Sequence, residues 1–318
     1  MTNVHVHTHT PVLLAEVIDG LQVQADGIYM DCTFGRGGHT RGLLEKLGPR
    51  GRVVAIDRDP QAVAAGRALA AEDPRLSVEQ ANFDGIAGVA AAHQVAGRLN
   101  GVLFDLGVSS PQLDDITRGF SFQDDGPLDM RMDQSAGESA AQWLAKAGDE
   151  EIAGVLRNYG EERHARRIAR AIVAQRVEAP IETTRRLADI VAGAQPRTGR
   201  RHGARLKHPA TRTFQAIRIH INAELEALDA ALDQVPGILA AEGRLAVISF
   251  HSLEDRRVKR FIRARSRGPT APRGMPVVPP GAPAELRSVG RPIRAGEDEV
   301  RSNPRARSAV LRIAARRP

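Results

Sequence analysis

The chain of 318 residues is 42% hydrophobic, so it can bury at least one sizeable core, as one large domain or two smaller ones. A single cysteine, Cys32, excludes an intramolecular disulfide and a multi-cysteine metal site, which agrees with a reducing compartment. The net charge of +7 is uneven, because residues 1–150 sum to −9 and residues 151–318 to +16.

The first segment, MTNVHVHTHTPVLLAEVIDGL, has no cationic leader, and Glu16 and Asp19 interrupt its apolar run. It is therefore expected to be neither a signal peptide nor a membrane span, and we predict a cytoplasmic protein without a membrane partner. Thr10 and Pro11 have the character of an N-cap and a first-turn proline, which predicts an amphipathic helix over VLLAEVIDGL.

Strand and helix patterns then alternate up to residue 107. The patterns predict strands at GIYMDCT, RVVAID, LSVEQ and GVLFDLG, and helices at HTRGLLEKLG, at PQAVAAGRALAAE and over roughly residues 84–93. Strands separated by helices imply right-handed crossovers and a parallel sheet.

The alternation stops between about residues 108 and 213. A loop rich in glycine and aspartate is followed by helical patterns around Ala140 and Ile152, over 165–177 and over 184–194, which predicts an inserted helical subdomain. A basic block between Pro196 and Arg218 contains no acid, which is typical of polyanion binding or of a solvated basic loop. Its cations are Arg197, Arg200, Arg201, Arg205, Lys207, Arg212 and Arg218.

The sheet pattern resumes in the last third of the chain. We expect one long helix over FQAIRIHINAELEALDAALDQV, a strand at GRLAVISF, a helix at LEDRRVKRFIRAR, an irregular stretch over 268–296 and a final edge strand at SAVLRIAAR. The last 63 residues carry 17 lysines and arginines against four acids, which favours a nucleic-acid partner. The predicted division is therefore 1–108, then an insertion over 109–212, then 213–318 with the basic C-terminal region.

The stretch TFGRGGHT, residues 33–40, forms a glycine-rich turn between a predicted strand and a predicted helix. A dinucleotide fingerprint would require glycines at 35, 37 and 40, but residue 40 is Thr40, and no lysine follows as in a phosphate loop. Glycine at 35, 37 and 38 allows positive φ and close approach of a ligand to the backbone. An ordinary tight connection is the alternative.

Two further residues favour an adenosine ligand. Asp57 ends the second predicted strand and would accept hydrogen bonds from ribose hydroxyls, and Phe83 follows the third strand, where an adenine ring would stack. S-adenosylmethionine satisfies this pattern because it carries adenosine without phosphate.

Nine motifs in order resemble the ribosomal RNA small subunit methyltransferase H family, including DCTFGRGGHT, AIDRDPQA, FDLGVSSPQLDD, YGEERHARRIARAI and ISFHSLEDRRVKRF. The resemblance implies a class I (Rossmann-like) methyltransferase that methylates N4 of a cytidine in small-subunit ribosomal RNA, near the decoding region, with S-adenosylmethionine. It implies that the cofactor is bound by residues in the first 112 positions: Gly37, Gly38, His39, Asp57, Phe83, Asp105 and Gln112.

Asp105, at the end of the fourth strand, is also our candidate for the reaction centre, where it would orient the target amine, the amino group of the cofactor, or both. Ser109 and Ser110 are further candidate acceptors, although serine is also common in turns. Methylation at carbon 5 would require a cysteine nucleophile on the base-binding loops, and Cys32 lies instead beside the cofactor turn.

His251 in HSLEDR would approach the target or belong to a helix N-cap turn with Ser252 as the cap. His5, His7 and His9 are more typical of a flexible tail than of metal ligands, and we expect no metal site. Two rival functions stay open, a non-catalytic RNA-binding or assembly factor and a nicotinamide-dependent oxidoreductase. The expected partner is small-subunit ribosomal RNA or the small ribosomal subunit, and a homodimer also stays open.

Overall fold

A computed structural model describes residues 11–195, 208–267 and 284–318. The chain forms two compact units, Met1–Gly107 with Glu226–Pro318, and Val108–Leu225. The expected division at 109 and 213 stays a prediction about domains, because compactness alone does not show that a part folds by itself. Thr10 and the three N-terminal histidines lie outside the described residues.

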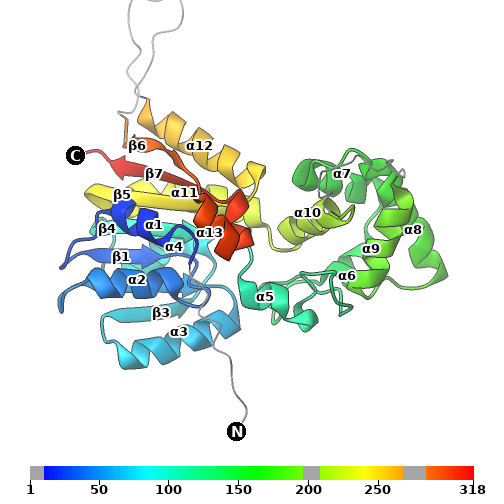
Figure 1. Ribbon diagram of the computed structural model, residues 1–318, viewed down its shortest axis with the longest axis horizontal. Coiled ribbons are helices and arrows are strands. Elements are labelled where there is room, and N and C mark those ends of the chain that lie inside the picture. Colours follow the sequence, from blue (N-terminus) through cyan, green and yellow to red (C-terminus); the bar gives the residue numbers. More distant parts are fainter. Residues whose placement is uncertain (1–10, 196–207, 268–283) are drawn as a thin grey trace, which may run out of the picture. The chain divides into compact units, whose positions relative to one another are not determined.

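The first unit contains a seven-stranded sheet in the order β3-β2-β1-β4-β5-β7-β6 (Figure 1). Strands β1 to β5 pair in parallel, whereas β7 is antiparallel to both β5 and β6. This confirms the expected α/β fold with a mostly parallel sheet. The strands are β1 Ile28–Asp31, β2 Arg52–Asp57, β3 Leu76–Gln80, β4 Leu99–Asp105, β5 Leu239–Ser249, β6 Leu286–Ile293 and β7 Val310–Arg316.

Helices cover both faces of this sheet (Figure 1). Successive residues of a strand point to opposite faces, so Leu103 of β4 packs in one apolar cluster and Phe104 in the other. Helices α1, α2 and α3 bury side chains in the cluster of Leu103, and α4, α11 and α12 in that of Phe104. The helices are α1 Leu14–Leu21, α2 Gly38–Lys46, α3 Pro60–Glu72, η1 Phe83–Gly85, α4 Ile86–Ala92, α11 Glu224–Ile238, α12 Ser252–Ser266, α13 Glu297–Ser302 and η3 Pro304–Ser308.

The second unit is helical, which confirms the predicted insertion between β4 and β5. Its apolar core gathers side chains such as Trp143, Leu156, Ile172 and Phe214 from four different helices. Each fully buried side chain of this kind contributes roughly 1.5–3 kcal/mol. The helices are α5 Ser110–Asp114, η2 Ile116–Arg118, α6 Ala140–Lys146, α7 Asp149–Gly160, α8 Ala165–Glu178, α9 Thr184–Ala194 and α10 Thr211–Ile221.

The expected long helix from residue 214 to 235 is wrong, because the chain breaks into α10 and α11 at Asn222 and Ala223. Ala223 has φ 46°, and the buried amide of Asn222 donates to Met130 O at 2.7 Å and accepts from Met132 N at 2.8 Å. Tertiary hydrogen bonds to this amide therefore override the helical periodicity.

Three other expectations about the ends of the chain need correction. Helix α1 begins at Leu14, because Leu13 has φ 55° and its N–H donates to Glu299 Oε1 at 2.8 Å. Residues 286–293 form strand β6, whereas 268–283 lie outside the described residues. The C-terminal strand β7 lies between β5 and β6, so β6 is the edge strand, which tolerates Pro292.

Candidate active site

Three neighbouring strands end in an aspartate. Asp57, Asp31 and Asp105 are the last residues of β2, β1 and β4, which are adjacent in the sheet. Because parallel strands bring their carboxyl ends to one edge, these carboxylates share the edge at which α/β proteins bind ligands. Asp57 and Asp105 are the two of these residues that the sequence predicts in the site.

The glycine turn follows Asp31 and is held by the neighbouring strand. Gly35 N donates to Asp57 Oδ2 at 2.8 Å, and Gly35 and Gly37 have φ of 56° and 74°. A Cβ on Gly37 would lie 2.6 Å from the ring of Phe34, so only glycine fits there. Gly38 begins α2, so a helix starts at the same edge. A turn of this kind fits a ligand that approaches the backbone closely.

Thr40, which breaks the dinucleotide pattern, has a structural partner. Its hydroxyl donates to Asp31 Oδ2 at 2.7 Å, and Asp31 Oδ1 accepts from Thr33 N at 3.1 Å. Asp31 is only 1% exposed, and this burial raises the pKa of its carboxyl. Asp31 therefore fixes both ends of the turn, a role that strand-end position alone did not identify.

His39 lies inside the turn as a buried link between two segments. Its Nε2 lies 3.0 Å from Val12 O, and because a carbonyl only accepts, Nε2 carries the hydrogen. Its Nδ1 therefore faces Asp105 Oδ2, at 3.5 Å. The side chain is 5% exposed. His39 therefore links the glycine turn to Val12 and lies beside Asp105, and its expected contact with the cofactor stays a prediction.

Asp105 has one carboxylate oxygen that the fold leaves unused. Among the described residues Oδ1 is buried without a hydrogen-bond partner, whereas the side chain as a whole keeps 28% exposure. Burial raises the pKa of Asp105 to about 6, and the electrostatic effect of His39 lowers it in part. The backbone N–H of Asp105 donates to Thr33 Oγ1 at 2.7 Å, which ties the end of β4 to the glycine turn. An unused acceptor at this edge fits an amino-group ligand.

Asp57 and Phe83 lie on the β2–β3 side of the same edge. Burial also raises the pKa of Asp57 to about 6. Its carboxylate accepts hydrogen bonds from the backbone N–H groups of Asp59 and Gly35, which lower the pKa in part. Each carboxylate oxygen has a second lone pair for a ribose hydroxyl. Phe83 opens η1, and its ring forms a T-shaped pair with that of Phe104, with the two centroids 5.9 Å apart. Its expected contact with adenine stays a prediction.

Ser109, Ser110 and Gln112 belong to the second unit, around the short helix α5. Ser109 is the N-cap of α5, and its N–H donates to Gln112 Oε1 at 2.9 Å. The capping box accounts locally for Ser109 and Gln112. Their expected roles beside Asp105 stay predictions.

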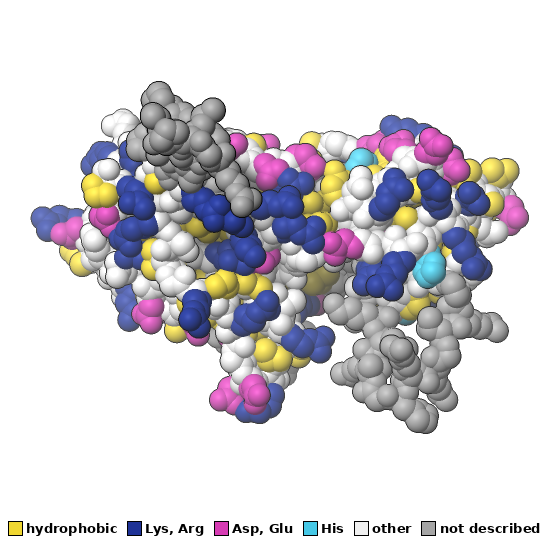
Figure 2. All heavy atoms as spheres, turned by 90° about the horizontal axis from the view of Figure 1, so that it is seen from above, with side chains coloured by type: hydrophobic (Ala, Val, Ile, Leu, Met, Phe, Trp, Pro, Cys, Tyr) yellow, Lys and Arg dark blue, Asp and Glu magenta, His cyan; other side chains and the backbone are white. Residues whose placement is uncertain are grey.

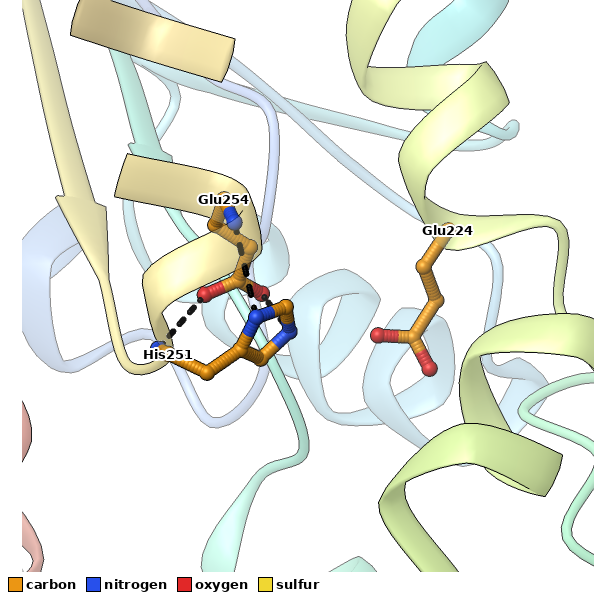
Figure 3. Close-up of side chains that lie close together, drawn as sticks. All are labelled: Glu224, His251 and Glu254. Carbon is orange, nitrogen blue, oxygen red and sulfur yellow. Dashed lines mark hydrogen bonds and ion pairs between the residues drawn. The ribbon is translucent and has the colours of Figure 1, made fainter. Parts of the chain in front are cut away.

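The loop after β5 supports the structural interpretation of His251, with a correction. His251 itself, not Ser252, is the N-cap of α12. The buried carboxylate of Glu254 accepts from Phe250 N at 2.8 Å and lies 3.1 Å from His251 Nε2 (Figure 3). Glu224, also drawn in Figure 3, belongs to the second unit, where it binds Arg218 with two contacts of 2.8 Å.

Cys32 is buried beside the turn, and burial raises the pKa of its thiol well above the usual range. A thiol in this state is a poor nucleophile. This supports the expectation that methylation at carbon 5 is not the chemistry.

Residues 197–207 of the predicted basic block lie outside the described residues. The two remaining cations have local partners, since Arg212 donates to Glu161 O at 3.3 Å and Arg218 binds Glu224. No described helix is both long and apolar enough to cross a membrane.

Helix α12 presents a second basic surface, on the first unit. Lys and Arg side chains gather on the face where α12 lies (Figure 2). Arg256, Lys259, Arg260 and Arg263 are exposed at helical spacing, which predicts a stripe of positive charge. Such a stripe suits a phosphate backbone.

Comparison with known proteins shows the family to which the chain belongs. The model of the MraW methylase family matches residues 6–317. The chain belongs to this family. The membership expected from the nine motifs is thereby confirmed.

One relative matches the chain nearly end to end. The chain is 57% identical over 309 residues to "Ribosomal RNA small subunit methyltransferase H" of Thioalkalivibrio sulfidiphilus, which spans 97% of both chains. Two solved structures are similar at low identity. One is an rRNA methylase of Streptococcus thermophilus, which is 10% identical with a TM-score of 0.43, and the match covers 98% of this chain and 100% of that one. The other is a protein of Streptococcus mutans described as a methyltransferase in complex with SAH, which is 11% identical with a TM-score of 0.43, and the match covers 97% of this chain and 99% of that one. Scores this low add nothing to the family assignment.

Proposed function

We propose that the chain transfers a methyl group from S-adenosylmethionine to the exocyclic N4 of a cytidine in small-subunit ribosomal RNA. The observation that carries this proposal is the 57% identity, over 97% of the chain, to a ribosomal RNA small subunit methyltransferase H. The edge of the sheet supports it, because its carboxylates and glycine turn suit an adenosine ligand with an amino group.

Different residues of the first unit would contact different parts of the cofactor. The glycine turn would hold the methionine part, Asp57 would accept hydrogen bonds from the ribose hydroxyls, and Phe83 would pack on the adenine. When bound, S-adenosylmethionine supplies an electrophilic methyl group on a sulfonium. The carboxylates of Asp31 and Asp105 favour a positively charged ligand at this edge, since opposite charges attract strongly where water is scarce.

Asp105 is the residue to which we assign the reaction centre. Cytosine N4 is a weak nucleophile because its lone pair is delocalised into the ring, so an acceptor for its hydrogens helps. The buried, unused Oδ1 provides that acceptor, and a carboxyl with a pKa of about 6 is ionised at neutral pH yet able to take a proton. His39 Nδ1 lies 3.5 Å from the other oxygen, Oδ2, and pairs with it when this nitrogen also carries a proton.

Incubation of the protein with labelled S-adenosylmethionine and small ribosomal subunits tests the proposal. We expect label in the RNA. Binding of RNA and cofactor without any transfer would instead indicate a non-catalytic assembly factor. Binding of NADH but not of S-adenosylmethionine would indicate an oxidoreductase.

A further inference from the structure

The second unit contains a cavity of about 800 Å³ that the proposed reaction does not use. Its lining runs from Asp125 to Ala194 in the sequence, so the cavity lies wholly within this unit. Volumes of this size accommodate small molecules or a few linked groups.

The cavity is a groove along two packed helices. Helix α8 contributes Arg167, Ala171 and Gln175, which are four residues apart and therefore share one face. Helix α9 contributes a matching face with Ile190 and Gly193. From residue 167 to 175 the groove extends about 12 Å, at roughly 1.5 Å per residue.

The two helices run in opposite directions along the groove. Arg186, at the start of α9, donates through Nη2 to the carbonyls of Gln175 and Ala179, at 3.4 and 3.1 Å, which end α8. Arg185 and Arg186 therefore mark one end of the groove, and Arg167, in the first turn of α8, lies toward the other.

Cations stand at both ends of the groove, and small or apolar side chains lie between them. Arg167 and Arg185 are exposed, and within the described parts of the chain neither guanidinium has an acidic partner. Arg186 Nε is buried without a hydrogen-bond partner among the described residues. Ala171 and Ile190 form an apolar middle.

Two acidic residues in the lining restrict which ligands the groove can bind. Asp125 and Asp189 would repel a plain polyanion or an acidic peptide at these points, but they accept hydrogen bonds from hydroxyl and amino groups. A strand of RNA offers phosphates for the arginines, 2′-hydroxyls and base amino groups for the aspartates, and a base face for the apolar middle.

We propose that this groove binds a short single-stranded segment of the RNA substrate. The phosphates lie at Arg167 and Arg185, and a base packs over Ala171 and Ile190. The assignment rests on the proposed function, and it gives a role to Arg167 within the motif YGEERHARRIARAI, which the methyl-transfer site leaves without one.

The first test reverses charge at the two ends of the groove. The double variant Arg167→Glu and Arg185→Glu is compared with Arg166→Glu and Arg170→Glu, which removes the same charge from exposed positions outside the lining. Glu is favourable in the first turn of a helix, so the groove variant should fold.

The second test fills the groove without changing charge. A Cβ on Gly193 meets nothing within 4 Å, so Gly193→Leu places a side chain in open space inside the groove. Gly154 in α7 has the same free surroundings outside the groove, and Gly154→Leu is its matched control.

Binding of deproteinised small-subunit ribosomal RNA is measured at several salt concentrations, together with methyl transfer and S-adenosylmethionine affinity. We expect the double variant to bind RNA at least tenfold more weakly, with a salt slope reduced by about 1.4, since each lost phosphate contact of a single strand removes about 0.7. Gly193→Leu should weaken binding at least fivefold with an unchanged salt slope. Cofactor affinity should not change.

Groove variants that bind RNA as well as their matched controls overturn the groove assignment, even if the wild type methylates RNA. A wild type that binds RNA through the groove but transfers no methyl group overturns the proposed function and leaves the groove assignment standing. The two failures are therefore distinguishable.

Discussion

The buried carboxylate of Asp105 destabilises the folded state, although the proposed reaction uses it. Its Oδ1 is buried without a partner among the described residues, and burial raises the pKa of the carboxyl to about 6. The folded state therefore binds this proton more tightly than the unfolded chain does. The stability contributed by that proton is present below about pH 4 and is lost as the pH rises to about 6.

Asp105→Asn should therefore stabilise the fold and impair the reaction. A shift of roughly two pKa units corresponds to about 3 kcal/mol or less, so the unfolding free energy should rise by about 1–3 kcal/mol at pH 8, with little change near pH 4. Methyl transfer should fall by about 100-fold or more. The wild-type rate should rise with pH through about 6, as Asp105 ionises.

Urea unfolding at the two pH values and transfer rates across pH 5–8 check both parts. Asp19→Asn, at an exposed position of α1, is the control and should change neither quantity. Full turnover of Asp105→Asn would remove Asp105 from the reaction centre.

At the residue scale, sequence positions predicted which side chains meet at the sheet edge but not how they bind one another. Asp57 was recognisable because it ends an apolar strand 22 residues after Gly35, and the structure joins the two directly. The bond between Thr40 and Asp31 and the approach of His39 to Asp105 depend on side-chain directions, which no spacing rule gives.

At the scale of elements, the glycine turn depends on backbone geometry. Gly37→Ala forces an L-residue into φ 74° and a Cβ toward Phe34, so we expect a loss of about 1–2 kcal/mol or more in unfolding free energy and weaker cofactor binding. Titration with S-adenosylmethionine and urea unfolding measure the two effects.

The control for this variant is Gly88→Ala in α4, where a Cβ meets nothing within 4 Å. It should be neutral or stabilise by up to about 1 kcal/mol. Equal behaviour of the two variants would show that the turn does not need glycine at 37.

The break between α10 and α11 is the element that periodicity missed. The apolar pattern continues through it, and the break is fixed by the amide of Asn222, which bonds to the distant segment of Met130 and Met132. Long strands and helices with clear caps were predicted well, whereas β6 and this break depend on partners far along the chain.

Asn222→Ala leaves Met130 O and Met132 N buried without this partner, so unfolding free energy should fall by about 2–4 kcal/mol. Amide exchange at Met132 should accelerate, while exchange in β4 stays slow. Asn158→Ala on the exposed face of α7 should stay within about 0.5 kcal/mol of the wild type. An Asn222→Ala protein as stable as that control would contradict this explanation of the break.

At the scale of the whole molecule, the two parts of the chain differ in net charge. Residues 1–150 carry a net charge of −9, and residues 151–318, which hold most of the arginines, carry +16. The sequence anticipated this division and a nucleic-acid partner. The groove of α8 and α9 needed the structure, because its lining combines faces of two helices with Asp125 from a loop.

The most direct test of the central claim is to identify the methylated nucleoside. RNA from small ribosomal subunits, treated with the protein and labelled S-adenosylmethionine, is digested to nucleosides and separated. We predict label in N4-methylcytidine, at one position of the RNA. Label at carbon 5 of cytosine, on a ribose oxygen or on another base would contradict the account.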